Sequence, residues 1–512
     1  MRNKIEFAVD KKKIAKNTLT LYFRMAFTML VGFFVTRVSL EVLGSQDFGL
    51  NNLVGGVVAM FSFINGSMGT AVQRFYSVSI GKGDTEKIKK IFGCGLYLHI
   101  IVAIITLIIA EIFAFFFLYK LNIPIERQNA AQIVFQLAII SMVIHIVNVP
   151  YTAMLRARED FTTIAFADII TALLRLGILY LLYIIDYDKL ILFSILNFMI
   201  SLWSVGFLTI KARKYKETHT FICRDKGLIK EMLAFVSLLL FTVLAQVVRD
   251  NGLTLLVNLF FGLVLNAAFA IASQVSHLVT GFVMNFKQSI VPQLMAAWGA
   301  GDKNAVYGLI NLGTKITFLL MLVISLPIIT ESEFLLRIWL KAPPLYSSNL
   351  VSLAIISVNI SSFTYFLYQA VHATGKIKSQ QIAISVLYFL NILFIYLAYK
   401  LGGNFYMAYY ITILASVGQC VINIYFANKY LGFSAFSFCK NIVSRCIITA
   451  ILTIIPCILV INFIEMGWMR LIINSILILS TCCIIGFFLL MNKGEKDKVI
   501  ILIRGILNRK VR

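Results

Sequence analysis

Long apolar runs separated by short charged breaks cover almost the whole chain. A helix of about twenty apolar residues matches the ~30 Å hydrocarbon core of a bilayer, and these runs lack the strict alternation of barrel strands. The pattern therefore predicts an all-α polytopic membrane protein with about 14 transmembrane helices. The expected spans are residues 18–42, 50–78, 91–118, 131–154, 162–184, 190–210, 232–259, 264–296, 306–329, 350–371, 380–400, 405–427, 441–464 and 469–491.

Composition and charge agree with this pattern and add a topology. Hydrophobic residues make up 60% of the 512 residues, which excludes an ordinary soluble protein. The net charge of +23 would suit nucleic acid only on a soluble basic surface, and the spans leave no soluble domain. With a basic, cytoplasmic N-terminus, most Lys and Arg residues fall on the cytoplasmic side. We therefore expect a multi-pass protein of a bacterial cytoplasmic (inner) membrane with both termini cytoplasmic.

The largest hydrophilic insert, residues 211–230, divides the chain. It is either a solvated loop or a contact with anionic lipid. The expected domains are an N-terminal six-helix bundle (1–212), a basic cytoplasmic linker (213–230), a C-terminal six-helix bundle (231–430), transmembrane helices 13 and 14 (431–492) and a basic cytoplasmic tail (493–512). No loop is long enough to fold as a catalytic domain.

An internal repeat relates the two halves. An offset of 218 residues aligns four landmarks, and an offset of 217 aligns two more. Six helices on each side of the linker preserve direction in the membrane, so the repeats are expected to be parallel, enclosing a central substrate path used by alternating access. The pairs are Gly44 with Gly262, Gly81 with Gly299, Gly83 with Gly301, Asp84 with Asp302, Tyr151 with Tyr368 and Ala153 with Ala370.

Charged residues inside or at the edges of spans are mostly cations. A charge at the bilayer centre costs about 2.5–3.5 kcal/mol on insertion scales unless it faces a partner or water, so such residues mark candidate sites. Nine cations against three acids favour an anionic cargo. The cations are Arg24, Arg37, Arg74, Arg175, Arg249, Lys287, Lys315, Arg445 and Arg470, and the acids are Glu111, Asp168 and Asp250.

The site candidates follow from depth and spacing. Asp168 and Arg175 share nearly one helical face, so they either neutralise each other or take part in binding or gating. Adjacent Arg249 and Asp250 indicate either a cavity-lining segment or a local kink. We expect a substrate-binding set of cavity cations, with snorkelling to headgroups as the alternative for Arg24 and the two lysines. That set is Arg24, Arg175, Arg249, Lys287 and Lys315, and the ion-coupling candidates are Glu111, Asp168 and Asp250.

Signals for covalent chemistry are weak throughout the sequence. The eight cysteines are best interpreted as small apolar filler, and the scattered intramembrane histidines lack metal-ligand spacing. No Walker-type phosphate loop is present. We therefore expect no enzyme, no catalytic residue, no metal and no cofactor, with a proton or sodium gradient as a possible energy source.

Several stretches resemble a known family. They are residues 17–24, 42–49, 51–65 and 81–84, and in the second half 257–262, 266–268 and 299–302. They resemble the polysaccharide-transporter branch, the Wzx-type O-antigen flippases, of the multidrug/oligosaccharidyl-lipid/polysaccharide (MOP) exporter superfamily, over about residues 17–430. The resemblance implies an inward-facing V of two six-helix bundles, a cationic cavity at Arg24, Arg175 and Arg249, and last helices that line a groove for a lipid tail.

The resulting hypothesis is a flippase. It would move an undecaprenyl-diphosphate-linked oligosaccharide repeat unit to the outer leaflet for O-antigen or capsule biosynthesis. The expected partners are that lipid-linked oligosaccharide, membrane lipid, and a polysaccharide polymerase or other envelope biosynthesis proteins, with no nucleic acid. The alternatives are an ion-coupled multidrug exporter of the same superfamily, whose cavity should be acidic and aromatic, and a membrane glycosyltransferase or ligase.

Overall fold

The computed structural model describes residues 10–59, 62–117, 125–185, 187–219, 222–340, 343–490 and 496. Every regular element within these ranges is a helix, and none of the described residues forms a strand. The all-α prediction is therefore confirmed. The expected tail, residues 493–512, lies outside the described residues apart from Lys496.

Most of the described helices are long and apolar enough to cross a membrane. Eleven described segments pass that test, and the bent pair α10 (Ser347–Ser362) and α11 (Tyr365–Thr374) makes a twelfth. The eleven come from α3 (Thr85–Phe117), α4 (Gln128–Ala157), α5 (Phe161–Ile184), α6 (Lys189–Ala212), the two parts of α7 (Lys226–Ala300), α8 (Lys303–Thr330), α12 (Lys378–Lys400), α13 (Met407–Leu431), α15 (Ser444–Phe463) with the short α14 (Ala435–Phe438) before it, and α16 (Trp468–Ile485).

The first helix is too long to be one span. α1 (Lys11–Ala59) has 49 residues, which at about 1.5 Å each would reach about 74 Å, more than twice the ~30 Å of hydrocarbon. It breaks at Gly44, whose backbone is non-helical (φ 74°, ψ 168°). The part before the break occupies the first expected span, and the part after it, continued by α2 (Ser62–Gly81), occupies the second. The prediction of about 14 spans is compatible with this arrangement.

The second long helix breaks in the same way. α7 has 75 residues and one non-helical position, Gly262, with φ 78° and ψ −171°. Both breaks use the positive-φ region that glycine adopts without a Cβ clash. Gly44 and Gly262 are separated by the repeat offset of 218. The repeat therefore extends from residue identity to backbone conformation.

A second matched feature follows each break at the far end of the next helix. Gly83 and Gly301 both adopt positive φ, 68° and 79°. In the residue after each, Asp84 and Asp302, a side-chain oxygen accepts a hydrogen bond at 2.9 Å from the backbone N–H three residues later. Each glycine thus ends one helix and each aspartate caps the next, at the same repeat position.

Among the described glycines, Gly81 and Gly299, another matched pair, have the closest backbone neighbours. A Cβ added to Gly81 would lie 1.8 Å from the carbonyl oxygen of Ala296, and a Cβ added to Gly299 would lie 2.0 Å from that of Val78. Residues 78 and 296 are also related by the offset of 218. The ends of α2 and α7 therefore cross through a pseudo-symmetric pair of contacts, which we call the glycine crossing, where only glycine leaves room.

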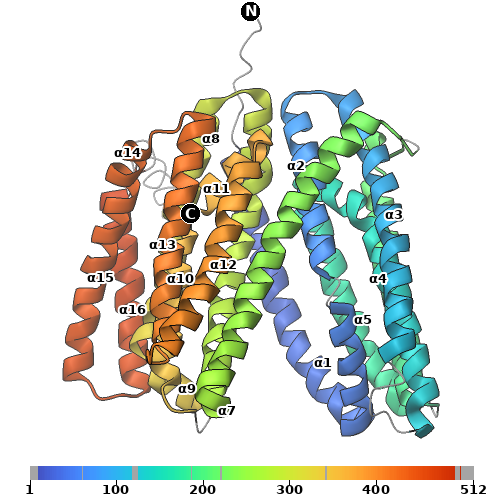
Figure 1. Cartoon of the computed structure of the whole chain (residues 1–512), viewed down its shortest axis with the longest axis horizontal. Coiled ribbons are helices and arrows are strands. Elements are labelled where there is room, and N and C mark those ends of the chain that lie inside the picture. Colours follow the sequence, from blue (N-terminus) through green and yellow to red (C-terminus); the bar gives the residue numbers. More distant parts are fainter. Residues whose placement is uncertain are drawn as a thin grey trace, which may run out of the picture. The chain divides into compact units, whose positions relative to one another are not determined.

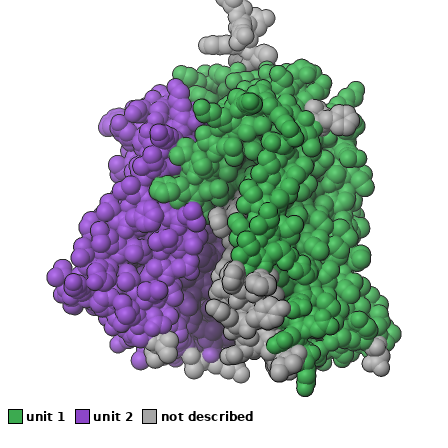
Figure 2. Space-filling view, turned by 45° about the vertical axis from the view of Figure 1, so that its right-hand side comes forward, with its two compact units in different colours: residues 1–243, 288–305 green, residues 244–287, 306–512 purple. Residues whose placement is uncertain are grey.

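The chain forms two compact units (Figure 2). Unit 1 comprises Met1–Val243 with Gln288–Ala305, and unit 2 comprises Leu244–Lys287 with Val306–Arg512. α7 contributes its two ends to unit 1 and its middle to unit 2. Part of the expected linker forms a 3-10 turn, Lys216–His219, in which Glu217 and Thr218 are buried, so this part is packed rather than solvated.

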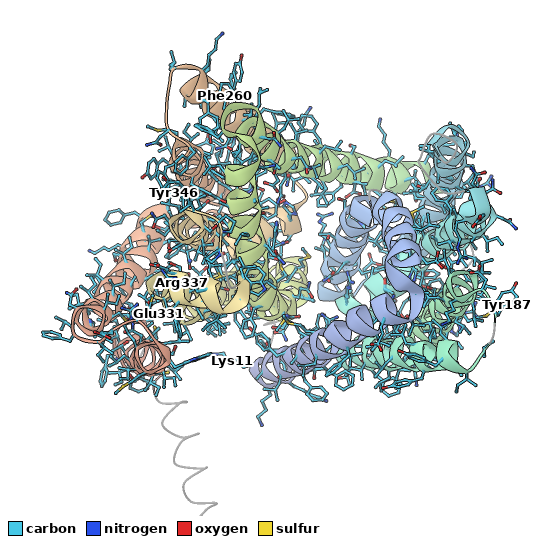
Figure 3. All side chains as sticks on the ribbon, turned by 90° about the horizontal axis from the view of Figure 1, so that it is seen from below. Lys11, Tyr187, Phe260, Glu331, Arg337 and Tyr346 are labelled. Carbon is cyan, nitrogen blue, oxygen red and sulfur yellow. The ribbon has the colours of Figure 1, made fainter. Side chains whose placement is uncertain are left out.

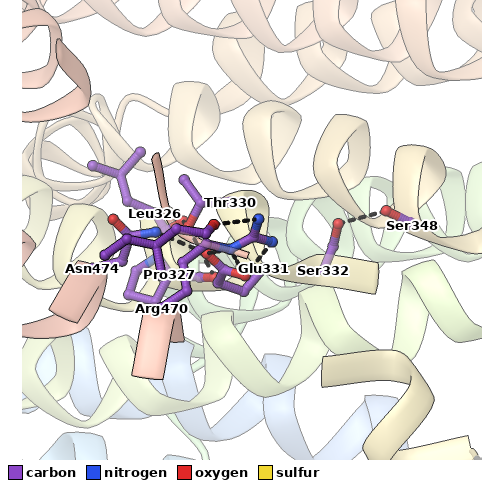
Figure 4. Close-up of polar contacts among 9 residues, drawn as sticks. Leu326, Pro327, Thr330, Glu331, Ser332, Ser348, Arg470 and Asn474 are labelled. Carbon is purple, nitrogen blue, oxygen red and sulfur yellow. Dashed lines mark hydrogen bonds and ion pairs between the residues drawn. The ribbon is translucent and has the colours of Figure 1, made fainter. Parts of the chain in front are cut away.

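The last two helices pack against each other in unit 2 (Figure 1) and reach α8 through a buried ion pair. Glu331 directly follows α8, and its side chain is 0% exposed. Its carboxylate accepts hydrogen bonds from Arg470 (Nη2 at 2.8 Å, Nε at 3.0 Å) and from Asn474 Nδ2 at 2.8 Å (Figure 4). Sequence reasoning placed Arg470 at a span edge but missed Glu331, because it lies just beyond the apolar run.

An aromatic cluster surrounds the break at Gly262. Phe260 and Phe261 pack on Tyr399, with ring centroids 5.6 and 4.7 Å apart, and Phe261 also meets Phe405. Tyr346 packs on Phe405 at 4.9 Å. Figure 3 labels Phe260 and Tyr346 of this cluster, together with Arg337 on the short helix α9 (Ser332–Leu340), an element that the sequence pattern did not predict.

We predict that Gly81→Ala destabilises the protein. The new methyl group meets a backbone carbonyl, so the two helices must separate, and overpacking of this kind costs about 1–3 kcal/mol. Gly177→Ala on α5 is the matched control, because a Cβ there meets nothing within 4 Å. Thermal unfolding in detergent should show a lower Tm for the first variant only, and equal Tm values would contradict the crossing.

We also predict that Glu331→Ala lowers stability by about 3–5 kcal/mol, since it leaves Arg470 buried without its counter-charge. Glu333→Ala, two residues later, breaks an exposed pair with Arg337 whose side chains are 56% and 57% exposed. That control should cost less than about 1 kcal/mol. Denaturant unfolding measures both, and similar losses for the two variants would argue against a buried anchor.

Candidate functional site

A charged cluster in unit 1 contains three of the predicted site residues. Arg24 on α1 donates a hydrogen bond from Nη1 to Asp168 Oδ2 on α5 at 2.9 Å. The two helices pack along each other, which brings together side chains 144 residues apart. The carboxylate is 43% exposed and the guanidinium 23%, so the pair is accessible at the surface of the unit.

Two more arginines lie within electrostatic range of the same carboxylate. Arg156 on α4 and Arg175 on α5 both interact electrostatically with Asp168, and Arg156 also interacts with Arg24. Both are exposed. We call Arg24, Arg156, Arg175 and Asp168 the arginine cluster. It carries three positive charges around one negative charge, so it favours a negatively charged ligand.

The cluster corrects one interpretation and adds one residue. Among the described residues, the ion pair of Asp168 is with Arg24, so Asp168 and Arg175 do not simply neutralise each other. Arg156 was missed because the expected span ended at residue 154, whereas α4 continues to Ala157. The buried apolar residues Leu155 and Ala157 on either side of Arg156 are the sequence signal that α4 continues past residue 154.

A second cluster lies in unit 2 on the middle of α7. Arg249 donates to Asp250 Oδ1 from Nε (2.9 Å) and Nη2 (2.8 Å), and its guanidinium lies 4.5 Å from the ring centroid of Tyr388. α7 stays helical here, since its one non-helical residue is Gly262. The kink interpretation of this segment is therefore wrong. Nearby on α12, Asn391 is buried, and its side-chain amide has no hydrogen-bond partner among the described residues.

The two candidate lysines lie inside unit 2. Lys287 is 3% exposed, donates to Ser362 Oγ at 3.2 Å and lies 4.6 Å from the ring centroid of Tyr365. Lys315 is also buried and interacts electrostatically with Cys446 of α15. Neither reaches out of the protein as a snorkelling lysine would, so that alternative is wrong for both.

The remaining acid, Glu111 on α3, accepts a hydrogen bond from Gln136 Nε2 of α4 at 3.0 Å. It is not among the contacts of the arginine cluster. Each of the three predicted acids therefore has a partner: an arginine for Asp168 and for Asp250, and an amide for Glu111. At these positions, the described residues do not form an acidic pocket for a cationic cargo.

Among the described residues, no group of three or more His, Cys, Asp or Glu side chains is placed to hold a metal ion. His99, buried on α3, shares a hydrogen bond of 2.6 Å with the carbonyl oxygen of Gly95, as expected for a core histidine. Tyr151 packs on Phe92 with ring centroids 5.0 Å apart, and Tyr368 packs on His372 with ring centroids 4.0 Å apart.

The comparisons with known proteins point to one fold. The MatE family model matches residues 20–181. No curated protein matches the chain. Among the similar solved structures is a MATE P26A mutant, with 13% identity and a TM-score of 0.72 over 84% of this chain and 98% of that one. An outward-facing multidrug resistance MATE transporter of the MOP superfamily has 12% identity and a TM-score of 0.65 over 82% of this chain and 96% of that one. A MOP superfamily transporter from Pyrococcus furiosus, for which a reverse polarity of the binding pocket suggests a different function, has 12% identity and a TM-score of 0.66 over the same shares.

At these identities the solved structures establish the fold and not the cargo. Proteins of the MatE family are transporters rather than enzymes, in line with the expectation that this chain is not an enzyme. None of the matches singles out the polysaccharide branch. The chain is therefore a multi-pass membrane protein with the fold of the solved MATE structures, and its residues 20–181 match the MatE family model.

Proposed function

We propose that this protein exports an amphipathic solute by alternating access, driven by a proton or sodium gradient. The MatE match and the shared fold support this proposal, and they support multidrug export better than oligosaccharide flipping, because the named relatives include a multidrug resistance transporter. The candidate function with the stronger comparative support is thus an ion-coupled multidrug exporter.

One observation favours a second candidate. The arginine cluster carries two more positive than negative charges, and each predicted acid already has a partner. A cationic drug would meet repulsion there, whereas a phosphate or diphosphate would receive bidentate arginine contacts. This supports a lipid-diphosphate-linked oligosaccharide as the cargo. The Pyrococcus relative, with its reverse pocket polarity, is a precedent for a charge change within this fold.

The cluster also suggests how binding and coupling would be linked. A diphosphate that binds Arg24, Arg156 and Arg175 competes with Asp168 for Arg24. The carboxylate released from Arg24 has then lost its counter-charge and is open to a coupling cation. Cargo and ion would thereby both act on the equilibrium between the inward-facing and outward-facing states. Each shifts that equilibrium only by the difference between its affinities for the two states.

The cellular setting belongs to the proposal as well. The distribution of Lys and Arg supports cytoplasmic termini, and the bacterial cytoplasmic membrane remains a prediction. The division into bundles 1–212 and 231–430 around a linker, and partners such as a polysaccharide polymerase, remain predictions. A glycosyltransferase or ligase is the least supported alternative, since the family matched is one of transporters.

The cargo is tested by reconstituting the protein in liposomes with two probes, a cationic dye and a fluorescent lipid-diphosphate-linked oligosaccharide, with and without an ion gradient. Gradient-dependent movement of the dye alone would establish the multidrug exporter. Movement of the glycolipid alone would establish the second candidate. If neither probe moves above empty liposomes under any gradient, both cargo assignments are wrong.

We predict that Arg156→Ala and Arg175→Ala each slow glycolipid movement about tenfold or more. A charged hydrogen bond contributes about 1.5–3 kcal/mol, and 1.4 kcal/mol corresponds to tenfold. Arg337→Ala, which removes an exposed arginine of α9, should leave the rate within twofold. For dye transport the two cluster variants should be neutral or faster, because they remove repulsion; a tenfold loss of dye transport would contradict the charge argument.

A further inference from the structure

The turn between α4 and α5 carries three consecutive charged residues, Arg158, Glu159 and Asp160, and the outer two bind the linker. Arg158 pairs with Glu217, and Asp160 pairs with Lys214. Burial acts to raise the pKa of Asp160, but hydrogen bonds from Lys214 and Thr163 outweigh it and lower that pKa below its usual value. The pKa of Lys214 is raised by the same hydrogen bond. These two pairs fix the turn to the linker.

Glu159, the middle residue, contacts α1 and α7 instead of the linker. Glu159 Oε2 accepts hydrogen bonds from Gln293 Nε2 near the end of α7 (2.9 Å) and from Asn17 Nδ2 on α1 (3.4 Å), and its Oε1 lies 3.6 Å from Lys13 Nζ. All these residues belong to unit 1. One carboxylate thus connects the first turns of α1 with the last turns of α7.

The backbone of Glu159 is held in an unfavourable conformation. Its φ is +59°, in the left-handed region that a glutamate seldom adopts. Such conformations persist only where the surroundings impose them, and they gather at switches and binding sites. Here the neighbours Arg158 and Asp160 form ion pairs with the linker, and the side chain of Glu159 points toward α1 and α7.

A second polar contact joins the same two helices. Thr18 Oγ1 and Ser289 Oγ lie 2.9 Å apart, and Gln293 Nε2 also donates to the carbonyl oxygen of Asp10 at 3.3 Å. These hydrogen bonds can be exchanged for bonds to water when the helices part. One to two turns further along α7, the glycine crossing offers no such exchange, because backbone packs directly on backbone there.

From these two kinds of contact we propose a latch and a pivot. The contacts of Glu159 and of the Thr18–Ser289 pair form a releasable latch that opens and closes during transport, while the glycine crossing stays closed and acts as the pivot. The middle of α7 belongs to unit 2 and its last turns to unit 1, so a motion of the middle during alternating access is transmitted to the end that the latch and the crossing hold. The inference rests on the proposed function, since a static protein would need no releasable contact.

The test locks the latch. In a Cys223→Ser, Cys439→Ser, Cys483→Ser background, Thr18→Cys with Ser289→Cys places two sulfur atoms where oxygens 2.9 Å apart stood, within reach of a disulfide bond. Oxidation should reduce transport of the active probe at least tenfold, and dithiothreitol should restore it. Full transport by the cross-linked protein would overturn the latch, and so would failure of the pair to cross-link.

A matched pair controls for oxidation itself. Ser332 and Ser348 join α9 to α10 with oxygens 2.6 Å apart (Figure 4). Nothing in the proposal requires this contact to open, so the oxidised Ser332→Cys, Ser348→Cys protein should transport within twofold of its reduced form. An equal loss of transport in this control would remove the support for a specific latch.

Hydrogen exchange separates a failed latch from a failed function, because it needs no transport. Glu159→Gly removes the carboxylate and suits the positive φ, so the fold should persist. We expect exchange at least fivefold faster in residues 10–18 and 288–293, and unchanged in 213–219. Asp160→Ala, the neighbouring control, should show the opposite pattern. Unchanged exchange at α1 and α7 in Glu159→Gly would overturn the latch even in a protein that transports neither probe.

Discussion

A charged side chain inside hydrocarbon must find its partner within the protein, and this constraint organises the molecule. It pairs Arg24 with Asp168, Arg249 with Asp250, and Arg470 with Glu331, and it keeps Lys287 on a hydroxyl and an aromatic ring. Each pair also joins elements or fixes a side chain at a defined depth. The excess of arginine around Asp168 is therefore the feature that supports our second candidate function, an anionic cargo.

The internal repeat places matched backbone features in both halves of the chain. Glycines with positive φ break α1 and α7 at equivalent positions, and a matched glycine and aspartate end and cap the helices that follow. The third matched pair, Gly81 and Gly299, forms a contact between the two repeats themselves. This backbone contact therefore follows the same offset of 218 residues as the other matched pairs.

The sequence predicted the helical class, the approximate spans and the repeat, because hydrophobic period and glycine spacing are local signals. It could not predict which cation meets which acid: Asp168 seemed to belong with Arg175 on its own helix, yet Arg24 arrives from α1 through tertiary packing. Glu159 and Glu331 were missed for a related reason. Both lie in short breaks where carboxylates are ordinarily solvated, and only the fold shows that each is surrounded by partners.

The central claim is that the arginine cluster faces alternate sides of the membrane during transport. The most direct measurement is the labelling of Ala172→Cys, which lies on α5 between Asp168 and Arg175, in the Cys223→Ser, Cys439→Ser, Cys483→Ser background. A membrane-impermeant thiol reagent is added to one side of oriented vesicles and then to the other. The account predicts labelling from both sides, with the balance shifted by an ion gradient or by cargo. Labelling from one side only, whatever the gradient or cargo, would contradict alternating access at this site.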